Sequence, residues 1–251
     1  MPRSREIVVF LGPTLPIGEA SEYLAGIYLP PAEQGCFVRT IQQYRPEAIV
    51  LIDGQFGRVP AVRHKEIIWA LAQGIPVFGA SSMGAIRAAE LAQMGMQGHG
   101  LIYRWFRATA LADDDEVAVA MTPVELGAKP LSEALINIRL TLRRAARSEI
   151  LSAEMATQLE ELARQTHFRN RTYPDLLEMA RETLPRHCFG TIDHFERWYP
   201  MNSVDQKRAD AVSLLNAIAL STTLEYRAPI PFHMTEAWAF DLATSNLELT
   251  D

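Results

Sequence analysis

A pair of adjacent serines carries the most informative chemistry in this sequence. Ser81 and Ser82 follow the apolar run 75–79 and precede a segment of small residues, which predicts a strand, a tight turn and a helix. The spacing Ala80-x-Ser82-x-Gly84 approximates the G-x-S-x-G motif of a nucleophile elbow, with alanine in the first small position. We therefore predict that Ser82, or alternatively Ser81, is a nucleophile. The other interpretation is a serine that only caps the helix.

A serine in such a turn lies beside the free N–H groups of the first helical turn. These groups stabilise the negative charge that develops on an oxygen during acyl transfer. We expect Met83 and Gly84 to supply them, with positive charge added by His64 or Arg87. The alternative for Arg87 is an ion pair with Glu90, one turn along the helix.

The preceding helical segment, 61–73, offers a base for the serine. At about 100° per residue, its polar residues gather on one side: Arg63, Glu66 and Gln73. His64 and Lys65 instead fall within the apolar arc. A lysine removed from water is available as a neutral amine, which is the base in Ser–Lys catalysis. We predict Lys65 as this base; the alternatives are a lysine whose amine reaches solvent and a hydrogen-bonded core histidine.

Apolar runs that alternate with helical patterns predict an α/β fold with a parallel sheet built from βαβ units. The expected strands are 7–11, 48–53 and 75–79, and the expected helices lie near 18–26, 35–45 and 61–73. Ligands of such sheets bind beyond the carboxyl ends of the strands. We therefore expect Thr14, Asp53 and the two serines to converge on one crevice. The alternatives are a helix cap at Thr14 and a plain turn at Asp53.

Helical patterns predominate in the second half of the chain, at 131–147, 152–165, 173–184 and 204–224. They divide the chain into an α/β catalytic core (1–125), a C-terminal α-helical subdomain (126–227) and an extended C-terminal tail (228–251). In the first of these helices Arg139, Arg143 and Arg147 recur every four residues. This basic stripe favours solubility or, alternatively, the docking of an acidic partner.

Composition narrows the possible partners. The 251 residues are 48% hydrophobic and carry a net charge of −6, which indicates a globular protein and argues against nucleic-acid binding. No membrane partner is indicated. Cys36 and Cys188 lack a zinc-binding spacing and fit a reducing cytoplasm, so we expect no metal and no cofactor, and sulfur carriage on a cysteine is the less favoured mechanism. The acidic run 113–116 predicts a solvated turn rather than a magnesium site.

An ordered series of motifs over about residues 7–120 closely resembles TfuA-like proteins. The motifs are Leu11-Gly12-Pro13-Thr14, Pro30-Pro31-Ala32, Ile52-Asp53-Gly54, His64-Lys65-Glu66, the segment 79–91 and Asp114-Asp115-Glu116-Val117. One departure is Cys36, which follows Gly35 where the family commonly has an aspartate. The resemblance also makes Asp114, Asp115 and Glu116 candidates for supporting the site or a partner surface.

The resemblance implies a partner of YcaO enzymes in peptide backbone thioamidation. It further implies a hydrolase that releases sulfide from a thiocarboxylated ThiS-type sulfur-carrier protein by a Ser–Lys mechanism, while YcaO binds the peptide substrate. Carried onto this sequence, the pair is Lys65 with Ser82 or Ser81. The alternative is a non-catalytic adaptor that recruits the peptide or the carrier to YcaO.

Overall fold

Two compact units make up the chain. The computed structural model describes residues 6–57, 59–109, 113–224 and 231–249. The sheet unit comprises Met1–Ala112, Val124–Ala128 and Lys207–Asp251, and the helical unit comprises Asp113–Pro123 and Lys129–Gln206. This division differs from the expected boundaries after residues 125 and 227, because the chain returns to the sheet unit at Lys207.

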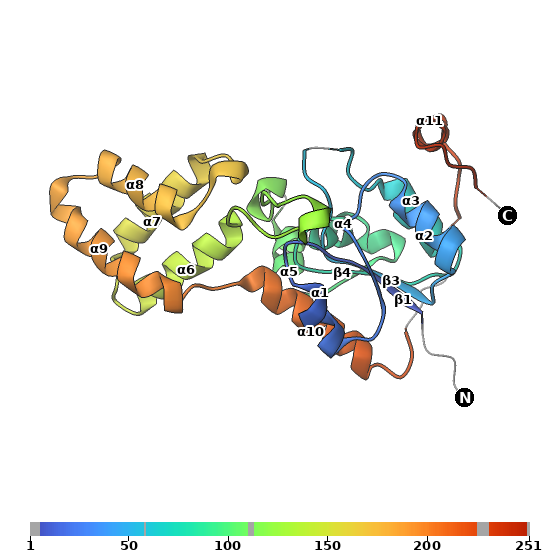
Figure 1. Cartoon of the computed structure of the whole chain (residues 1–251), viewed down its shortest axis with the longest axis horizontal. Helices are drawn as coiled ribbons and strands as arrows, with labels where there is room; N and C mark the ends of the chain where they lie inside the picture. The colour runs from blue at the N-terminus through green and yellow to red at the C-terminus, as the bar shows by residue number, and fades with distance from the viewer. Residues whose placement is uncertain (1–5, 58, 110–112, 225–230, 250–251) are drawn as a thin grey trace. The chain divides into compact units, whose positions relative to one another are not determined.

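A five-stranded parallel sheet forms the centre of the sheet unit, in the order β2-β1-β3-β4-β5 (Figure 1). The strands are β1 (Ile7–Phe10), β2 (Ile27–Leu29), β3 (Ala48–Leu51), β4 (Val77–Gly79) and β5 (Gln97–Gly98). The central pair is in register with Val9 opposite Val50. The predicted α/β fold with a C-terminal helical part is confirmed. Strands β2 and β5 were not predicted, because two or three residues are too few to show a pattern.

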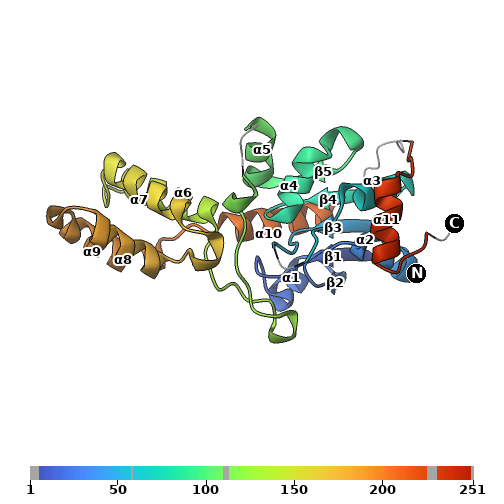
Figure 2. The ribbon, with the colours of Figure 1, turned by 90° about the horizontal axis from the view of Figure 1, so that it is seen from above.

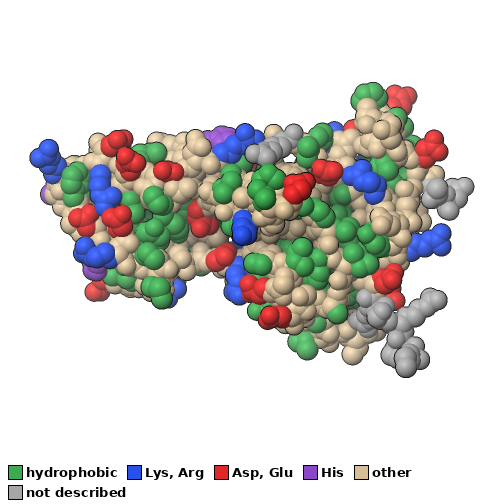
Figure 3. All heavy atoms as spheres, in the orientation of Figure 1, with side chains coloured by type: hydrophobic (Ala, Val, Ile, Leu, Met, Phe, Trp, Pro, Cys, Tyr) green, Lys and Arg blue, Asp and Glu red, His purple; other side chains and the backbone are tan. Residues whose placement is uncertain are grey.

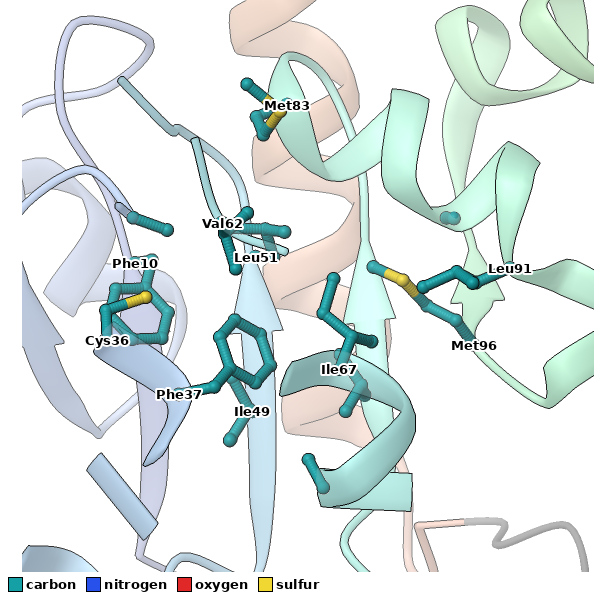
Figure 4. Packing of buried hydrophobic residues seen from close by; sticks show 14 of the residues in the cluster. Phe10, Cys36, Phe37, Ile49, Leu51, Val62, Ile67, Met83, Leu91 and Met96 are labelled. Atoms are coloured by element: carbon teal, nitrogen blue, oxygen red, sulfur yellow. The ribbon is translucent and has the colours of Figure 1, made fainter. Parts of the chain in front are cut away.

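Alternate residues of the central strands face two different layers of helices. One face packs on α2 (Cys36–Tyr44), α3 (His64–Ala72) and α4 (Met83–Glu90), around Phe10, Ile49 and Leu51 (Figure 4). The other face packs on α1 (Ile17–Tyr23) and α10 (Gln206–Leu220), around Val9, Val50 and Ile52. Helix α5 (Gly100–Ala108) follows β5 and packs on α4. Burial on both faces explains why the strands are continuous apolar runs.

The helical unit contains α6 (Leu135–Arg147), α7 (Ala153–Gln165), α8 (Tyr173–Thr183) and α9 (Phe189–Trp198), packed around one apolar cluster. Part of the acidic run 113–116 belongs to its framework. Glu116 accepts two hydrogen bonds from Arg139, at 2.7 and 2.9 Å, and Asp115 pairs with the buried Arg171. The expectation of a wholly solvated turn is therefore wrong for these two carboxylates, because each neutralises an arginine.

The basic stripe of α6 is interrupted by the same contacts. Arg139 pairs with Glu116 and Glu160 and is mostly buried, whereas Arg143 and Arg147 are exposed. Acidic and basic side chains are interspersed on the face of the molecule shown in Figure 3. None of the helices that the structure describes is long and apolar enough to cross a membrane.

The C-terminal segment is folded onto the sheet unit. It contains α11 (Glu236–Thr244), which lies over α2 and α3 (Figure 2). Trp238 is 2% exposed and its ring lies 6.3 Å from that of Trp69, while Arg63 pairs with Asp241 at 3.1 Å. The expectation of an extended tail is therefore wrong for the α11 region, where a buried tryptophan anchors a helix.

Glu66 on α3 is buried, although the helical pattern assigns it to the solvent side. Its carboxylate accepts hydrogen bonds from the backbone N–H groups of Gly35 (2.8 Å), Phe37 (3.2 Å) and Arg63 (3.2 Å). Burial raises the pKa of Glu66, and these N–H groups oppose that shift. The carboxylate thus joins the N-termini of α2 and α3.

Replacing Glu66 by glutamine tests this joint. Glutamine has an NH2 group in place of one carboxylate oxygen, and this group would face a backbone N–H that then has no acceptor. We therefore expect Glu66→Gln to lower the free energy of unfolding by about 1–3 kcal/mol. Glu47→Gln, at an exposed position, is the matched control and should stay within about 0.5 kcal/mol. Urea titrations measure both values. Equal stabilities of the two variants would contradict the joint.

Candidate active site

The serine turn is sharp because α4 begins directly against the end of β3. A Cβ atom at Gly84 would lie 1.8 Å from the Leu51 carbonyl oxygen, so only glycine fits there. Ser82 occupies the N-cap position of α4, yet its side chain makes no capping hydrogen bond. Ser81 has a φ of 70°, in the left-handed region that is costly for a residue with a side chain. The capping interpretation is therefore not supported, and the strain of a nucleophile elbow falls on Ser81.

Three expected site residues converge at the carboxyl edge of the sheet. The Thr14 hydroxyl donates to Asp53 Oδ1 at 2.7 Å, and the Ser81 hydroxyl contacts the Thr14 oxygen at 3.5 Å. Asp53 Oδ2 also accepts from the N–H groups of Gly12 (2.9 Å) and Thr14 (3.1 Å). All three side chains are buried, Ser81 completely. Thr14 therefore does not cap α1, and Asp53 organises the loop after β1 rather than forming a plain turn.

This cluster lies where the strand order reverses direction. Thr14 follows β1, whose chain continues into α1 on one face, and Asp53 follows β3, whose chain continues to α3 on the other face. In open parallel sheets, ligands bind at this point between the two strands. The contacts of Asp53 join the two loops at that point and hold the Thr14 hydroxyl toward the serine turn.

The helix N-terminus offers fewer free N–H groups than expected. The Gly84 N–H donates to the Ile52 carbonyl at 3.1 Å, so Gly84 does not present a free donor to a substrate. Among the described residues, none accepts a hydrogen bond from the Met83 N–H. Met83 therefore remains the candidate donor for an oxyanion at this turn.

His64 and Arg87 form a cluster of their own on α3 and α4. His64 is exposed, and its Nε2 lies 2.7 Å from Glu90 Oε2, which also accepts from Arg87 Nη1 at 2.7 Å. Partial burial alone would raise the pKa of Glu90, but the hydrogen bonds from His64 and Arg87 lower it overall. The expectation of a buried His64 is wrong, and the alternative Arg87–Glu90 pair is present.

Lys65 is partly exposed and is held by the C-terminal segment. Its Nζ donates to the His233 carbonyl at 3.1 Å and lies 5.5 Å from the centre of the Phe232 ring. No hydrogen bond joins Lys65 to Ser81 or Ser82 within the described part of the chain. The expected buried lysine is therefore not found on α3, because Glu66 takes the inward position when the helix begins at His64.

Two further groups bear on the chemistry. Cys36 lines a cavity of about 420 Å³ beside Pro31 and Arg39. Burial, with Glu66 nearby, raises the pKa of its thiol well above the ordinary value, which disfavours a reactive thiolate.

His99 was not identified from the sequence, because the two-residue strand that precedes it gives no pattern. The backbone N–H of His99 donates at 2.9 Å to the carbonyl of Gly79, the residue two positions before Ser81. The side-chain Nε2 of His99 lies 2.8 Å from Ser213 Oγ. Among the described residues, no group of three or more His, Cys, Asp and Glu side chains is arranged to hold a metal ion.

Comparison with known proteins identifies one family. The model of the family described as TfuA-like protein matches residues 53–172. No curated protein matches the chain. The matched segment begins at Asp53 and includes both serines, Lys65, and the acidic run 113–116, so the resemblance seen in the motifs is confirmed.

The strain at Ser81 can be measured as stability. Glycine tolerates a φ of 70° without cost, so we expect Ser81→Gly to be more stable than Ser81→Ala by about 1 kcal/mol. Denaturant titration of the two variants provides the comparison. If the Ser81→Gly variant is less stable than the Ser81→Ala variant, backbone strain at Ser81 is excluded.

Proposed function

The chain is a TfuA-like protein, as residues 53–172 show, and from this premise we propose that it hydrolyses a thiocarboxylated sulfur-carrier protein of the ThiS type. Its role is linked to YcaO-dependent peptide thioamidation, as the family indicates. In this proposal the released sulfide is supplied to a YcaO enzyme, which acts on the peptide. The single observation that carries the proposal is the strained, buried Ser81, whose hydroxyl contacts Thr14, which in turn donates to Asp53.

The geometry favours Ser81 over Ser82 as the nucleophile. Ser81 carries the backbone strain, and its hydroxyl is oriented by Thr14, whose own proton is directed to Asp53. The 3.5 Å separation is long for a pair of hydroxyls, and catalytic hydrogen bonds often shorten only when substrate binds. Thr14 and Asp53 act as positioning residues in this arrangement. Ser82, at the first position before α4, is the alternative nucleophile.

The reaction balances without an external reagent. The serine oxygen forms a bond to the thiocarboxylate carbon while a lysine amine takes the hydroxyl proton. That proton passes to the sulfur as the carbon–sulfur bond breaks, and hydrosulfide leaves. Water then attacks the acyl-serine as the same amine removes a proton from it, and the ammonium returns that proton to the serine oxygen as the ester bond breaks. The carboxylic acid that is released loses its own proton to solvent, and the serine is free again. The Met83 N–H is the candidate donor to the oxyanion in both steps.

Lys65 is the base that the motifs indicate. To act on either serine, its amine must leave the His233 carbonyl and the Phe232 ring, where the C-terminal segment holds it. The Lys65→Ala variant should then release no sulfide if this residue is the base.

A second candidate function is that of a non-catalytic adaptor for YcaO. The exposed Arg143 and Arg147 on α6 favour it, because exposed positive charges steer association with an acidic partner. The two functions separate when the purified protein is incubated with thiocarboxylated carrier in the absence of YcaO. A hydrolase releases sulfide under these conditions, whereas an adaptor releases none.

Alanine substitutions identify the nucleophile. We expect Ser81→Ala to lower the rate of sulfide release from the thiocarboxylated carrier by at least about 1000-fold, because the covalent step is lost. Ser82→Ala should lower it less, by about 10-fold. Sulfide is measured directly, and mass spectrometry of peptides locates the acyl adduct. An adduct on Ser82 would reverse the assignment, and near-normal release by both variants would reject the hydrolytic function.

A further inference from the structure

We propose that a cavity of about 300 Å³ between β5 and α10 binds the C-terminal residues of the sulfur carrier, the carrier tail, and directs their thiocarboxylate to the serine turn. This inference rests on the proposed hydrolytic function and names the subsite that the substrate would occupy. The main chain of a protein can carry a thiocarboxylate only at its C-terminus. The carrier tail must therefore enter the site end first, as an extended peptide.

The cavity lies on the face of the sheet to which the residue before Ser81 belongs. Phe78 of β4 lines it from the sheet, and Leu214 and Ile218 line it from α10. These three side chains pack in the same apolar cluster as Ala80, which immediately precedes Ser81. The cavity and the serine turn are thus reached from the same side of β4.

His99 marks the end of the cavity that is nearest to the serine turn. Its side chain lines the cavity and lies 2.8 Å from Ser213 Oγ. Its backbone N–H donates to the Gly79 carbonyl at 2.9 Å, so His99 lies beside the end of β4. Ser81 follows Gly79 two positions later in the chain. A peptide that reaches His99 along the cavity therefore arrives at the edge of the sheet that carries the serine turn.

The outer side of β5 is suited to hydrogen bonding with an extended peptide. In the described part of the chain, β5 is the last strand of the sheet (Figure 2). Successive residues of a strand direct their backbone N–H and C=O groups to opposite sides. Because the His99 N–H points to β4, the backbone groups of Gly98 point away from it. Addition of a peptide strand at such an edge is a recurring mode of recognition.

The dimensions of the cavity fit a short segment with small side chains. On the α10 side the lining extends from Leu214 to Ser221, which is about 10 Å at the rise of an α-helix. An extended chain rises about 3.3 Å per residue, so about three residues fit along it. The volume lies at the lower end of the range for ligand pockets, about 300–1,000 Å³, which leaves little room for large side chains.

The lining is nearly free of charge. Among the described residues that line the cavity, none is Asp, Glu, Lys or Arg, and His99 alone can carry a positive charge. Neutral peptide groups match such a lining, and Gln97 and Thr223 add polar side chains to it. The negative charge of the thiocarboxylate, at the end of the carrier tail, would then lie toward His99.

Filling the cavity tests the proposal. Ala217 is exposed on α10 and lines the cavity, whereas Ala219, exposed on the same helix, is not among the described residues that line it. We expect Ala217→Trp to weaken binding of the carrier, in its ordinary carboxylate form, by about 10-fold or more, because the indole takes the space of the carrier tail. Ala219→Trp, the matched control, should stay within about 2-fold. Isothermal titration calorimetry measures both affinities, and circular dichroism reports whether each variant folds.

Shortening the carrier gives a second test, which needs no variant of this chain. A carrier without its last three residues should bind the unmodified protein about 10-fold more weakly or worse. In sulfide release from the thiocarboxylated carrier, Ala217→Trp should raise KM and leave kcat within about 3-fold, because the lost contacts are the same in the ground state and the transition state.

The outcomes separate the subsite from the reaction. Equal affinities of Ala217→Trp and Ala219→Trp for the carrier, or of the unmodified protein for the full and shortened carriers, would overturn the proposal. Binding that depends on both the carrier tail and the cavity, without sulfide release by the unmodified protein, would support the subsite and reject the hydrolytic function.

Discussion

The carboxylate of Asp53 is the contact on which the candidate site depends. It receives three hydrogen bonds from the loop after β1, two from N–H groups and one from the Thr14 hydroxyl. A buried carboxylate must be compensated in this way, because its charge has lost the solvation of water. The result is that the loops after β1 and β3 are joined where the strand order reverses, and Thr14 has one orientation toward Ser81.

Strain and close packing at the serine turn reinforce this arrangement. The glycine at position 84 allows α4 to begin against the Leu51 carbonyl, and Ser81, in the turn just before α4, has a positive φ. A strained residue persists only where its surroundings determine it. Here those surroundings are the end of β3 on one side and the Thr14–Asp53 pair on the other, so the same two loops hold both the backbone and the hydroxyl.

The convergence of Thr14, Asp53 and the serines could be predicted from the sequence, because carboxyl ends of parallel strands share an edge. The partial exposure of Lys65 could not be predicted. The position of α3 is set by Glu66, whose partners Gly35 and Phe37 lie about 30 residues away, and helical periodicity carries no information about such contacts. The role of α10 was missed for a similar reason: it covers the sheet from the far end of the chain, whereas its periodicity indicated only one more helix in a helical subdomain.

The parts of the site come from distant positions in the chain. Asp53 and Ser81 lie within the segment that matches the family, but Thr14 precedes it. Hydrogen bonds from Thr14 organise Asp53, and α10 supplies part of the apolar layer beneath Ala80. The matched segment alone therefore lacks the helices that cover one face of the sheet, and it lacks Thr14, which contacts Ser81. The chemistry that the motifs indicate belongs to the folded sheet unit, which the chain completes only when it returns at Lys207.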